Sequence, residues 1–286
     1  MSWLLAILAA LVGSCFLIVL FGTAVVALDS GAPMRPSRAA LGGFAREWAA
    51  HVLAAFTLPW AVLVPRARPA IGAALHPVPV VLLPGYLMNQ ACFWPLSAYL
   101  RRRGWAWVLP LNNRPRSAPV VAYARALDER IEALCKETGA AQVDIVAHSM
   151  GGIIAAVYIN RMGGDRRVRR LVTLGTPWQG TRMWVFAHLR QGLDLAPGCD
   201  AILAARSPGV PTTQIWSRSD HLVIPTAHNL CPGVAGIEVE RVGHVSMLVS
   251  AQVWRVITQL LTDDGAPLAA PLAPVAGSIA PAAEPA

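Results

Sequence analysis

The chain has 286 residues and a formal net charge of +8, with 55% hydrophobic and 14% charged residues. This length suits one α/β domain with a large core. Aromatic residues are not interleaved with the basic clusters, and the spacing of the five cysteines fits no zinc motif. We therefore expect no nucleic-acid partner and no metal site.

The first element in chain order is an uncharged apolar segment. Trp3–Leu28 is long enough to cross a bilayer as one helix. No Lys or Arg precedes it, whereas a signal peptide has a basic n-region and a shorter apolar core. We therefore expect residues 1–28 to be an uncleaved transmembrane anchor, and we expect the protein at a membrane, the inner membrane of a bacterium.

Residues 29–77 are predicted to be a linker with an accessory apolar helix. The apolar stretch Trp48–Pro65 contains Pro59 and is marginal in length for a membrane span. This favours a helix at the membrane interface or packed on the following domain over a second crossing. The arginines after the first segment place this loop in the cytoplasm. The side of the following domain depends on whether the stretch crosses, and it stays open.

Residues 78–262 alternate predicted strands and helices, which favours a mostly parallel sheet with helices on both faces. The segment 182–211 interrupts the alternation and is either a small flap over an acyl pocket or part of the core packing. From Asp263 the chain is rich in Ala and Pro, so 263–286 is predicted to be a disordered tail. The predicted elements are strands at Val78–Leu83, Trp105–Leu109, Val143–Ala147 and Val168–Leu174, and helices at Trp94–Arg103, Pro119–Thr138 and Met150–Met162.

The most informative motif is a small-x-Ser-x-Gly turn between a strand and a helix. An apolar, β-branched run ends at Ala147 and His148, Ser149 follows, and Met150 begins a predicted helix. Such a turn is strained and crowded, so its flanking positions must be small, as Ala147 and Gly151 are. The pattern predicts that Ser149 is a nucleophile that forms an acyl-serine.

Partners for this serine follow in the order acid, then histidine. Asp220 follows the predicted strand Thr213–Ser217, and His244 follows the predicted strand Ile237–Val242. A helix is expected at Met247–Leu261. Both side chains are thus placed just past strands, where open α/β sheets carry their active sites. Asp194 and Asp200 are alternative acids, although neither follows a clear strand.

An oxyanion hole is expected at the end of the first predicted strand. Pro84, Gly85 and Tyr86 end that strand, and Gly85 lets the backbone approach a substrate closely. The backbone N–H groups of Tyr86 and Met150 are the predicted donors to the tetrahedral oxyanion.

These segments together resemble the α/β-hydrolase superfamily, and most closely small bacterial lipases and esterases with an Ala-His-Ser-Met-Gly-Gly elbow. The similarity covers roughly 78–262. Two positions depart from the family pattern: Ala147 replaces the first elbow glycine, and Pro84 replaces the usual histidine before Gly85. The segments that carry the resemblance are 84–86, 147–152, 174–181, 217–225 and 242–248.

The resemblance implies a lipase or esterase with the triad Ser149, Asp220 and His244, which needs no cofactor. Acyl transfer to an alcohol and thioester cleavage by the same triad remain open, as does an inactive membrane-anchored binding module. A membrane and an acyl-ester or lipid substrate are the expected partners. Substrate chain length and oligomeric state are not predicted.

Two surface features stay undecided. The basic clusters Arg101–Arg103 and Arg166–Arg170 attract anionic lipid headgroups or form solvated faces. Cys199 and Cys231 lie in loops near the acid and could pair in an oxidising compartment.

Overall fold

The structure of the protein, a computed structural model, describes residues 2–30, 37–57, 75–115, 117–187 and 189–262. The predicted tail 263–286 lies outside these residues, as do 31–36 and 58–74 of the predicted linker segment 29–77, which include the second part of the stretch Trp48–Pro65.

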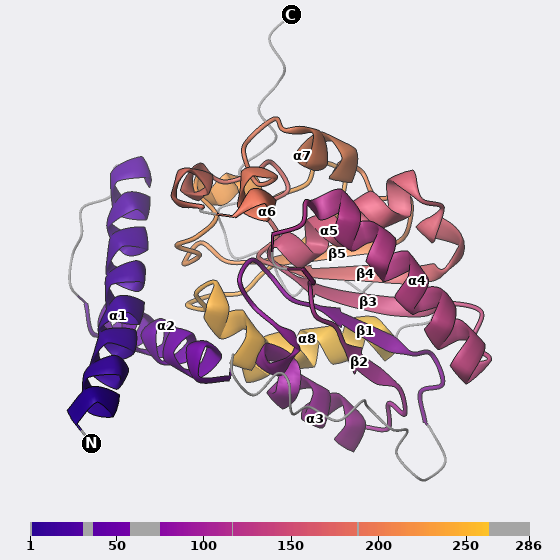
Figure 1. Ribbon diagram of the computed structural model, residues 1–286, viewed down its shortest axis with the longest axis horizontal. Helices are drawn as coiled ribbons and strands as arrows, with labels where there is room; N and C mark the ends of the chain where they lie inside the picture. The colour runs from indigo at the N-terminus through magenta and orange to yellow at the C-terminus, as the bar shows by residue number, and fades with distance from the viewer. Residues whose placement is uncertain (1, 31–36, 58–74, 116, 188, 263–286) are drawn as a thin grey trace, which may run out of the picture.

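A sheet of six strands forms the centre of the molecule (Figure 1). Its order is β2-β1-β3-β4-β5-β6, and every neighbouring pair is parallel. The predicted parallel sheet is therefore confirmed. The strands are β1 (Val80–Leu83), β2 (Val108–Pro110), β3 (Val143–His148), β4 (Val168–Leu174), β5 (Thr212–Trp216) and β6 (Ala235–Glu238).

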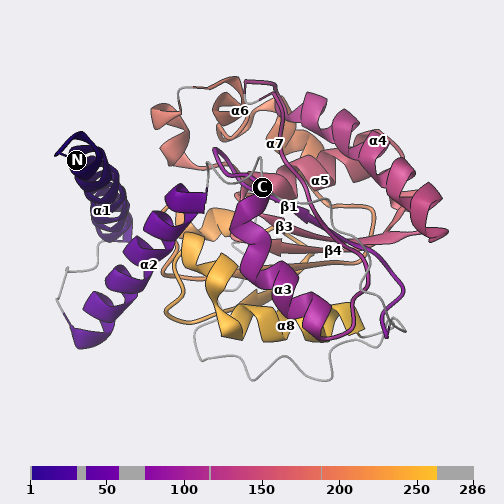
Figure 2. The same cartoon turned by 60° about the horizontal axis from the view of Figure 1, so that its bottom comes forward.

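Helices cover both faces of this sheet, as the sequence predicts (Figure 2). α4 (Val120–Thr138), α5 (Met150–Arg161) and α7 (Asp200–Ala205) pack on one face. α3 (Trp94–Arg102) and α8 (Ala251–Thr262) pack on the other. Successive side chains of β1 alternate between the two cores, since a strand has a period of two. Both faces are thus apolar, which explains the uninterrupted apolar run of this strand.

Two N-terminal helices stand beside the sheet (Figure 1). α1 (Ser2–Ser30) contains a stretch, Leu5–Asp29, that is long and apolar enough to cross a membrane. α2 (Arg38–Thr57) begins at Arg38 rather than at Trp48 and runs from α1 towards α3 and α8. The Trp48 indole N–H donates to the Val12 carbonyl at 3.1 Å, and Phe16 contacts Phe44 edge to face. The two helices therefore form a packed pair.

The last predicted strand and helix are the clearest errors of the sequence analysis. β6 covers Ala235–Glu238 instead of Ile237–Val242, because its partner β5 ends at Trp216, which pairs with Glu238. With no neighbour left to pair with, the chain leaves the sheet and turns at Arg241, whose φ is +58°. His244 therefore lies in a loop, and the 3-10 helix η6 (Val245–Val249) precedes α8.

In the cluster Arg166–Arg170, Arg167 and Arg169 form ion pairs within the domain. The Arg169 guanidinium contacts both carboxylate oxygens of Asp144, which is fully buried in β3, at 2.9 and 2.6 Å. Arg167 binds both oxygens of Glu132 on α4, at 2.6 and 2.8 Å. These two arginines hold elements of this domain together, which accounts for part of the cluster without a lipid surface.

Candidate active site

The predicted site residues gather at the carboxyl ends of neighbouring strands. The chain passes from β1 outward to β2 and then returns to β3 on the other side of β1. In open α/β sheets, ligands bind at such a reversal of strand order, past the carboxyl ends of the strands. The loop 84–86 leaves β1 there, and Ser149 leaves β3, so the fold brings the predicted oxyanion loop to the predicted nucleophile.

Ser149 occupies a strained turn between β3 and α5. Its φ is +54° and its ψ is −126°, a conformation that residues other than glycine rarely adopt. Two glycines make the turn possible. A Cβ on Gly151 would lie 2.5 Å from the Leu83 carbonyl oxygen, and one on Gly152 would lie 2.1 Å from Thr176 Oγ1. The sequence singled out Gly151 but missed Gly152 as a steric requirement.

Asp220 and His244 form a buried pair. Asp220 Oδ2 lies 2.7 Å from His244 Nδ1, and the two residues are 0% and 3% exposed. The other carboxylate oxygen, Oδ1, accepts the N–H groups of Leu222 and Val223 at 2.9 Å each. This geometry fixes the acid and leaves the far side of the imidazole, Nε2, for another partner.

The electrostatics of this pair favour an ionised acid and a basic histidine. Burial opposes the charged form of His244, but the neighbouring Asp220 and Glu47 carboxylates outweigh it, so the pKa of His244 is raised. Burial likewise opposes ionisation of Asp220, yet its charge interaction and hydrogen bond with His244 keep the pKa of Asp220 lowered. Each group thus stabilises the charge of the other.

Contacts on two sides bring His244 to the Ser149 turn. The ring of His148, the residue before Ser149, lies 4.8 Å from the His244 ring, and His148 Nε2 is 3.0 Å from the His244 carbonyl oxygen. On the other side, a Cβ on Gly175 would lie 3.0 Å from His244 Nδ1. The next residue, Thr176, donates its hydroxyl to the Ser149 carbonyl at 3.0 Å.

His148 is a buried and neutral neighbour of this pair. Burial, with a smaller contribution from the nearby His244 ring, lowers the pKa of His148 to about 3. His148 therefore adds no positive charge beside the predicted nucleophile at neutral pH.

The predicted oxyanion loop lies directly against Ser149. A Cβ on Gly85 would lie 2.8 Å from Ser149 Cβ, so this position requires glycine. Tyr86 is the next residue along this loop, and Met150 is the first residue of α5. The first N–H groups of a helix have no partner within the helix, so that of Met150 is free to bind an anion.

The segment 182–211 divides into a covering part and a core part. Its start is hydrogen-bonded to the segment 217–225 that carries Asp220, here called the acid loop, because Arg182 N donates to the Ile224 carbonyl at 2.7 Å. Leu189 N donates to the Tyr86 hydroxyl at 3.3 Å, which ties the same segment to the oxyanion loop. The 3-10 helix η4 (Arg182–Phe186) has no buried residue, whereas α7 buries Ile202 and Ala205 against α5. α6 (Arg190–Leu193) connects the two parts.

The alternative acids lie elsewhere in the structure. Asp194 Oδ2 accepts the Val120 N–H at 2.7 Å at the start of α4, and Asp200 is exposed in the first turn of α7. Only Asp220, of these three candidates, contacts His244. Cys199 and Cys231 are free thiols rather than a disulfide, and Cys199 Sγ contacts the Asp194 carbonyl.

One polar cluster beside the site was missed by the sequence analysis. A carboxylate oxygen of Glu47 and a ring nitrogen from each of His51 and His221 lie within 4.8 Å of one another. The Glu47 oxygens already accept hydrogen bonds from the backbone and hydroxyl of the His244 loop, so we assign the cluster to hydrogen bonding rather than to a metal. The only signal in the sequence was a charged residue within the apolar region that became α2.

Comparisons with known proteins agree with this architecture. A family model described as alpha/beta hydrolase fold matches residues 78–196. The mature lipase BlEst2 of Bacillus licheniformis is similar with a TM-score of 0.58 and 13% identity, over 70% of this chain and 98% of that one. Lipase B of Aspergillus fumigatus is similar with a TM-score of 0.59 and 19% identity, over 69% of this chain and 56% of that one. At these identities the structural likeness concerns the fold.

Proposed function

Because the chain has the alpha/beta hydrolase fold, we propose that it is a serine hydrolase that cleaves carboxylic acyl esters through an acyl-serine. The observation that carries this proposal is the buried contact of 2.7 Å between Asp220 Oδ2 and His244 Nδ1 beside the strained Ser149 turn. Ser149, Asp220 and His244 also follow the order in which this fold presents a triad. The lipases among the structural neighbours support an ester as the substrate class.

In the proposed acylation step, His244 Nε2 removes the proton of the Ser149 hydroxyl as Oγ attacks the ester carbonyl. Asp220 holds the imidazole by its Nδ1 and stabilises the imidazolium that forms. The carbonyl π bond breaks as the Oγ–C bond forms, and the electron pair moves to the carbonyl oxygen. The N–H groups of Tyr86 and Met150 bind this oxyanion.

The tetrahedral intermediate then collapses to the acyl-enzyme. His244 gives its proton to the departing alkoxide, so the alcohol leaves neutral and the acyl group stays on Ser149. Water enters, His244 removes its proton, and the second tetrahedral intermediate releases the carboxylic acid and regenerates Ser149. Side chains and backbone N–H groups are sufficient for each step.

The surroundings of the site support an apolar acyl group in the substrate. Val185 and Phe186 are exposed on η4, the 3-10 helix that is tied to the acid loop. Phe21 of α1 contacts Phe186 edge to face at a centroid distance of 5.2 Å. Exposed apolar side chains at the rim of a site favour lipid-like esters over small polar ones.

A membrane location is part of the same proposal. The stretch Leu5–Asp29 of α1 is long and apolar enough to cross a bilayer. We expect the full-length protein to stay in the membrane fraction after alkaline carbonate extraction. A soluble product whose mass lacks α1 would instead identify this helix as a cleaved signal sequence.

Hydrolysis of a p-nitrophenyl ester series by detergent-solubilised protein tests the activity. We expect Ser149→Ala and His244→Ala each to lower kcat by roughly 10⁴- to 10⁶-fold, as for other triad nucleophiles and bases. Ser117→Ala, at an exposed serine, is the matched control and keeps full activity. Turnover by Ser149→Ala equal to that of the wild type would remove Ser149 from the proposed role.

The products identify the acceptor of the acyl group. Hydrolysis predicts that the free carboxylic acid is the main product when a primary alcohol is added. A transesterified product that dominates at low alcohol concentration would indicate an acyltransferase. A preference for acyl thioesters over the matching oxygen esters would indicate a thioesterase.

A further inference from the structure

A carboxylate from α2 is buried in the loop that carries His244. Glu47 is 3% exposed. Its Oε1 accepts the Val245 N–H at 2.7 Å, and its Oε2 accepts the Ser246 N–H at 3.0 Å and the Ser246 hydroxyl at 2.6 Å. Three donors of one short loop thus converge on a carboxylate from a helix at the other end of the chain.

These contacts fix the backbone on both sides of His244. Val245 follows the histidine and binds Glu47 directly. Gly243 precedes it, and its N–H donates to the Ser246 oxygen at 2.9 Å, while that hydroxyl donates to Glu47. A Cβ on Gly243 would lie 2.3 Å from Glu47 Oε2, so any other residue there would displace the carboxylate.

The same carboxylate faces the loop of the acid. His221, which follows Asp220, places its Nδ1 3.6 Å from Glu47 Oε1, and His51 of α2 places its Nδ1 3.5 Å from the same oxygen. On the opposite side, a Cβ on Gly22 of α1 would lie 2.5 Å from the His221 carbonyl oxygen. The acid loop is therefore enclosed between α1 and Glu47.

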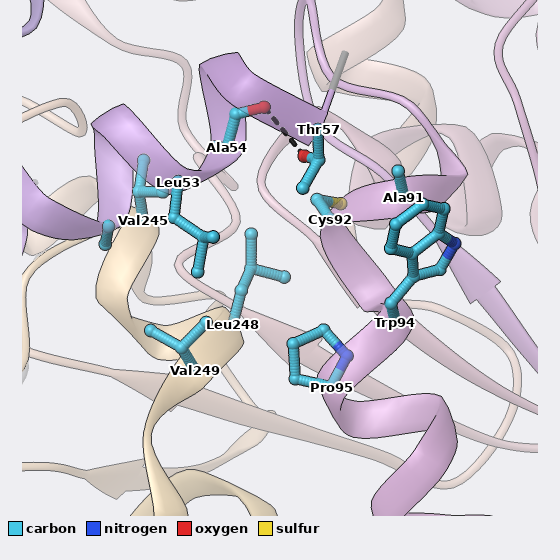
Figure 3. Close-up of a pocket in the computed structure, with 11 residues that line it drawn as sticks. Leu53, Ala54, Thr57, Ala91, Cys92, Trp94, Pro95, Val245, Leu248 and Val249 are labelled. Atoms are coloured by element: carbon cyan, nitrogen blue, oxygen red, sulfur yellow. Dashed lines mark hydrogen bonds between the residues drawn. The ribbon is translucent and has the colours of Figure 1, made fainter. Parts of the chain in front are cut away.

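Attachment of α2 to the domain does not by itself require a charge at this position. The next turns of the helix line an apolar cavity of about 110 Å³ that η6 and the start of α3 complete (Figure 3). Ala50, Leu53 and Ala54 face Val245 and Leu248 across this cavity, so apolar packing already holds the helix. A buried carboxylate is costly unless it is well paired, and apart from His51 of α2 the groups that contact Glu47 belong to the loops that carry His221 and His244.

We propose that Glu47 is a positioning residue for His244, so that the N-terminal helix pair completes the active site. The inference rests on the proposed function. Its geometric part is the orientation of the loop 243–246. Its electrostatic part is a negative charge that stabilises the imidazolium formed during acylation.

The groups that face His244 come from several elements. Asp220 is its hydrogen-bond partner, His148 lies at the end of β3, and Glu47, His51 and His221 form the cluster behind it. Burial lowers the pKa of His148 to about 3 and that of His221 to about 4, and it also lowers the pKa of His51. The charges that act on His244 near neutral pH are therefore the two carboxylates.

The test compares Glu47→Gln with wild type by the pH profile of ester hydrolysis. Gln keeps the size of the side chain but has no charge and only one oxygen acceptor. We expect kcat to fall by roughly 10- to 100-fold, as for a misplaced catalytic group. KM changes little. The acid limb of the kcat/KM profile moves to lower pH, because a negative charge that raises the pKa of His244 is lost.

Glu132→Gln is the matched control, since it removes the same charge from an exposed ion pair on α4 and keeps the wild-type profile. Ser246→Ala is the milder second variant, which removes one donor and keeps both N–H contacts. If Glu47→Gln does not fold, Ser246→Ala tests the proposal in its place. We expect it to lose less kcat than Glu47→Gln. An unmoved acid limb with activity that follows only the folded fraction would overturn the proposal.

Failure of the proposed function is distinguishable from failure of this inference. If the wild type neither hydrolyses esters nor forms an acyl-serine, the proposed function fails. NMR titration of the His244 ring in wild type and Glu47→Gln then still measures whether Glu47 raises its pKa. Equal pKa values in the two proteins would contradict the inference in either case.

Discussion

The two halves of the candidate site are held in place in different ways. The Ser149 half is built from its own strand, turn and helix, with Gly85, Gly151 and Gly152 providing the close approach of neighbouring backbones. The histidine and acid half lies on loops past β5 and β6 and is enclosed by residues of α1 and α2. One half is built within the central sheet and its turns, and the other also depends on contacts with the N-terminal helices.

The two halves of the site are expected to respond differently to substitutions in α1 and α2. Perturbation of the N-terminal helices is expected to displace the histidine and the acid while the serine turn stays intact. Because α1 touches the loop after Asp220, we expect a change in the surroundings of α1 to alter the proposed ester hydrolysis. The predictions below separate the two halves.

Among substitutions that leave the proposed triad itself unchanged, the largest effect is expected at Gly175, where the two halves meet. A Cβ there would lie 3.0 Å from His244 Nδ1 and 3.1 Å from Asp220 Oδ2, and the φ of +55° adds backbone strain. Gly175→Ala should therefore lower kcat by roughly 100-fold, the cost of a displaced catalytic group. Steady-state kinetics on a short-chain ester measures this effect.

Gly139→Ala is the control for backbone strain. Gly139 also has a positive φ, +72°, but a Cβ there meets no atom within 4 Å. It should lose stability by about 1–2 kcal/mol and keep its kcat. Equal losses of kcat in both variants would attribute the effect to strain rather than to contact with the His244–Asp220 pair.

A smaller effect is expected from α1. Gly22→Ala places a Cβ 2.5 Å from the His221 carbonyl oxygen, so the helix or the acid loop must shift. We expect a loss of about 1–3 kcal/mol of stability from overpacking, with a lower kcat. Gly13→Ala, where nothing lies within 4 Å, should keep kcat and gain about 0.5–1 kcal/mol of stability from helix propensity. Thermal unfolding and ester turnover of both variants in the same detergent test whether α1 braces the site.

The smallest effect on turnover accompanies a gradual loss of stability in acid. His148 and His221 are buried, which lowers their pKa values to about 3 and about 4, whereas the unfolded chain binds these protons near pH 6.5. Their contribution is present above pH 6.5 and is lost as the pH falls, by up to about 1.4 kcal/mol per pH unit for each group. The raised pKa of His244 acts oppositely, because its contribution is lost as the pH rises.

Unfolding midpoints between pH 4 and pH 8 measure this dependence. His221→Asn should flatten the acid side of the curve, and His148→Asn should do so to a similar degree. If neither variant changed the slope, the two histidines would not be buried in neutral form. His148 belongs to the Ser149 half and His221 to the other half, so the two variants show how much each half contributes to the acid dependence.

The fold could be predicted from the sequence because most of its strands and helices are marked by residues within the element itself. β4 spans the predicted residues, α5 ends one residue before the predicted boundary, and the order of strands and helices follows from apolar runs and turns. The bounds predicted for the last strand were wrong, because pairing with β5 decides where β6 ends. The end of β5 cannot be inferred from the residues of β6. His244 was nevertheless placed beside Asp220, since its loop follows the same edge of the sheet.

Glu47 could not be recognised from the sequence for a related reason. Its partners Val245 and Ser246 use mainly backbone groups, which every residue has. His221 stood within a quoted segment, but nothing in the sequence shows that it is buried beside α2. Interactions between distant segments through backbone groups leave no pattern in the sequence, so the contacts of α1 and α2 with the histidine half could be found only in the structure.

Labelling with a fluorophosphonate probe, followed by peptide mapping, tests the central claim most directly. The probe forms a covalent bond only with an activated serine, so the account predicts one adduct, on Ser149, at a rate that falls in Glu47→Gln and reaches zero in His244→Ala. Folded, detergent-solubilised wild-type protein that carries no adduct, or an adduct on another serine, would contradict the account.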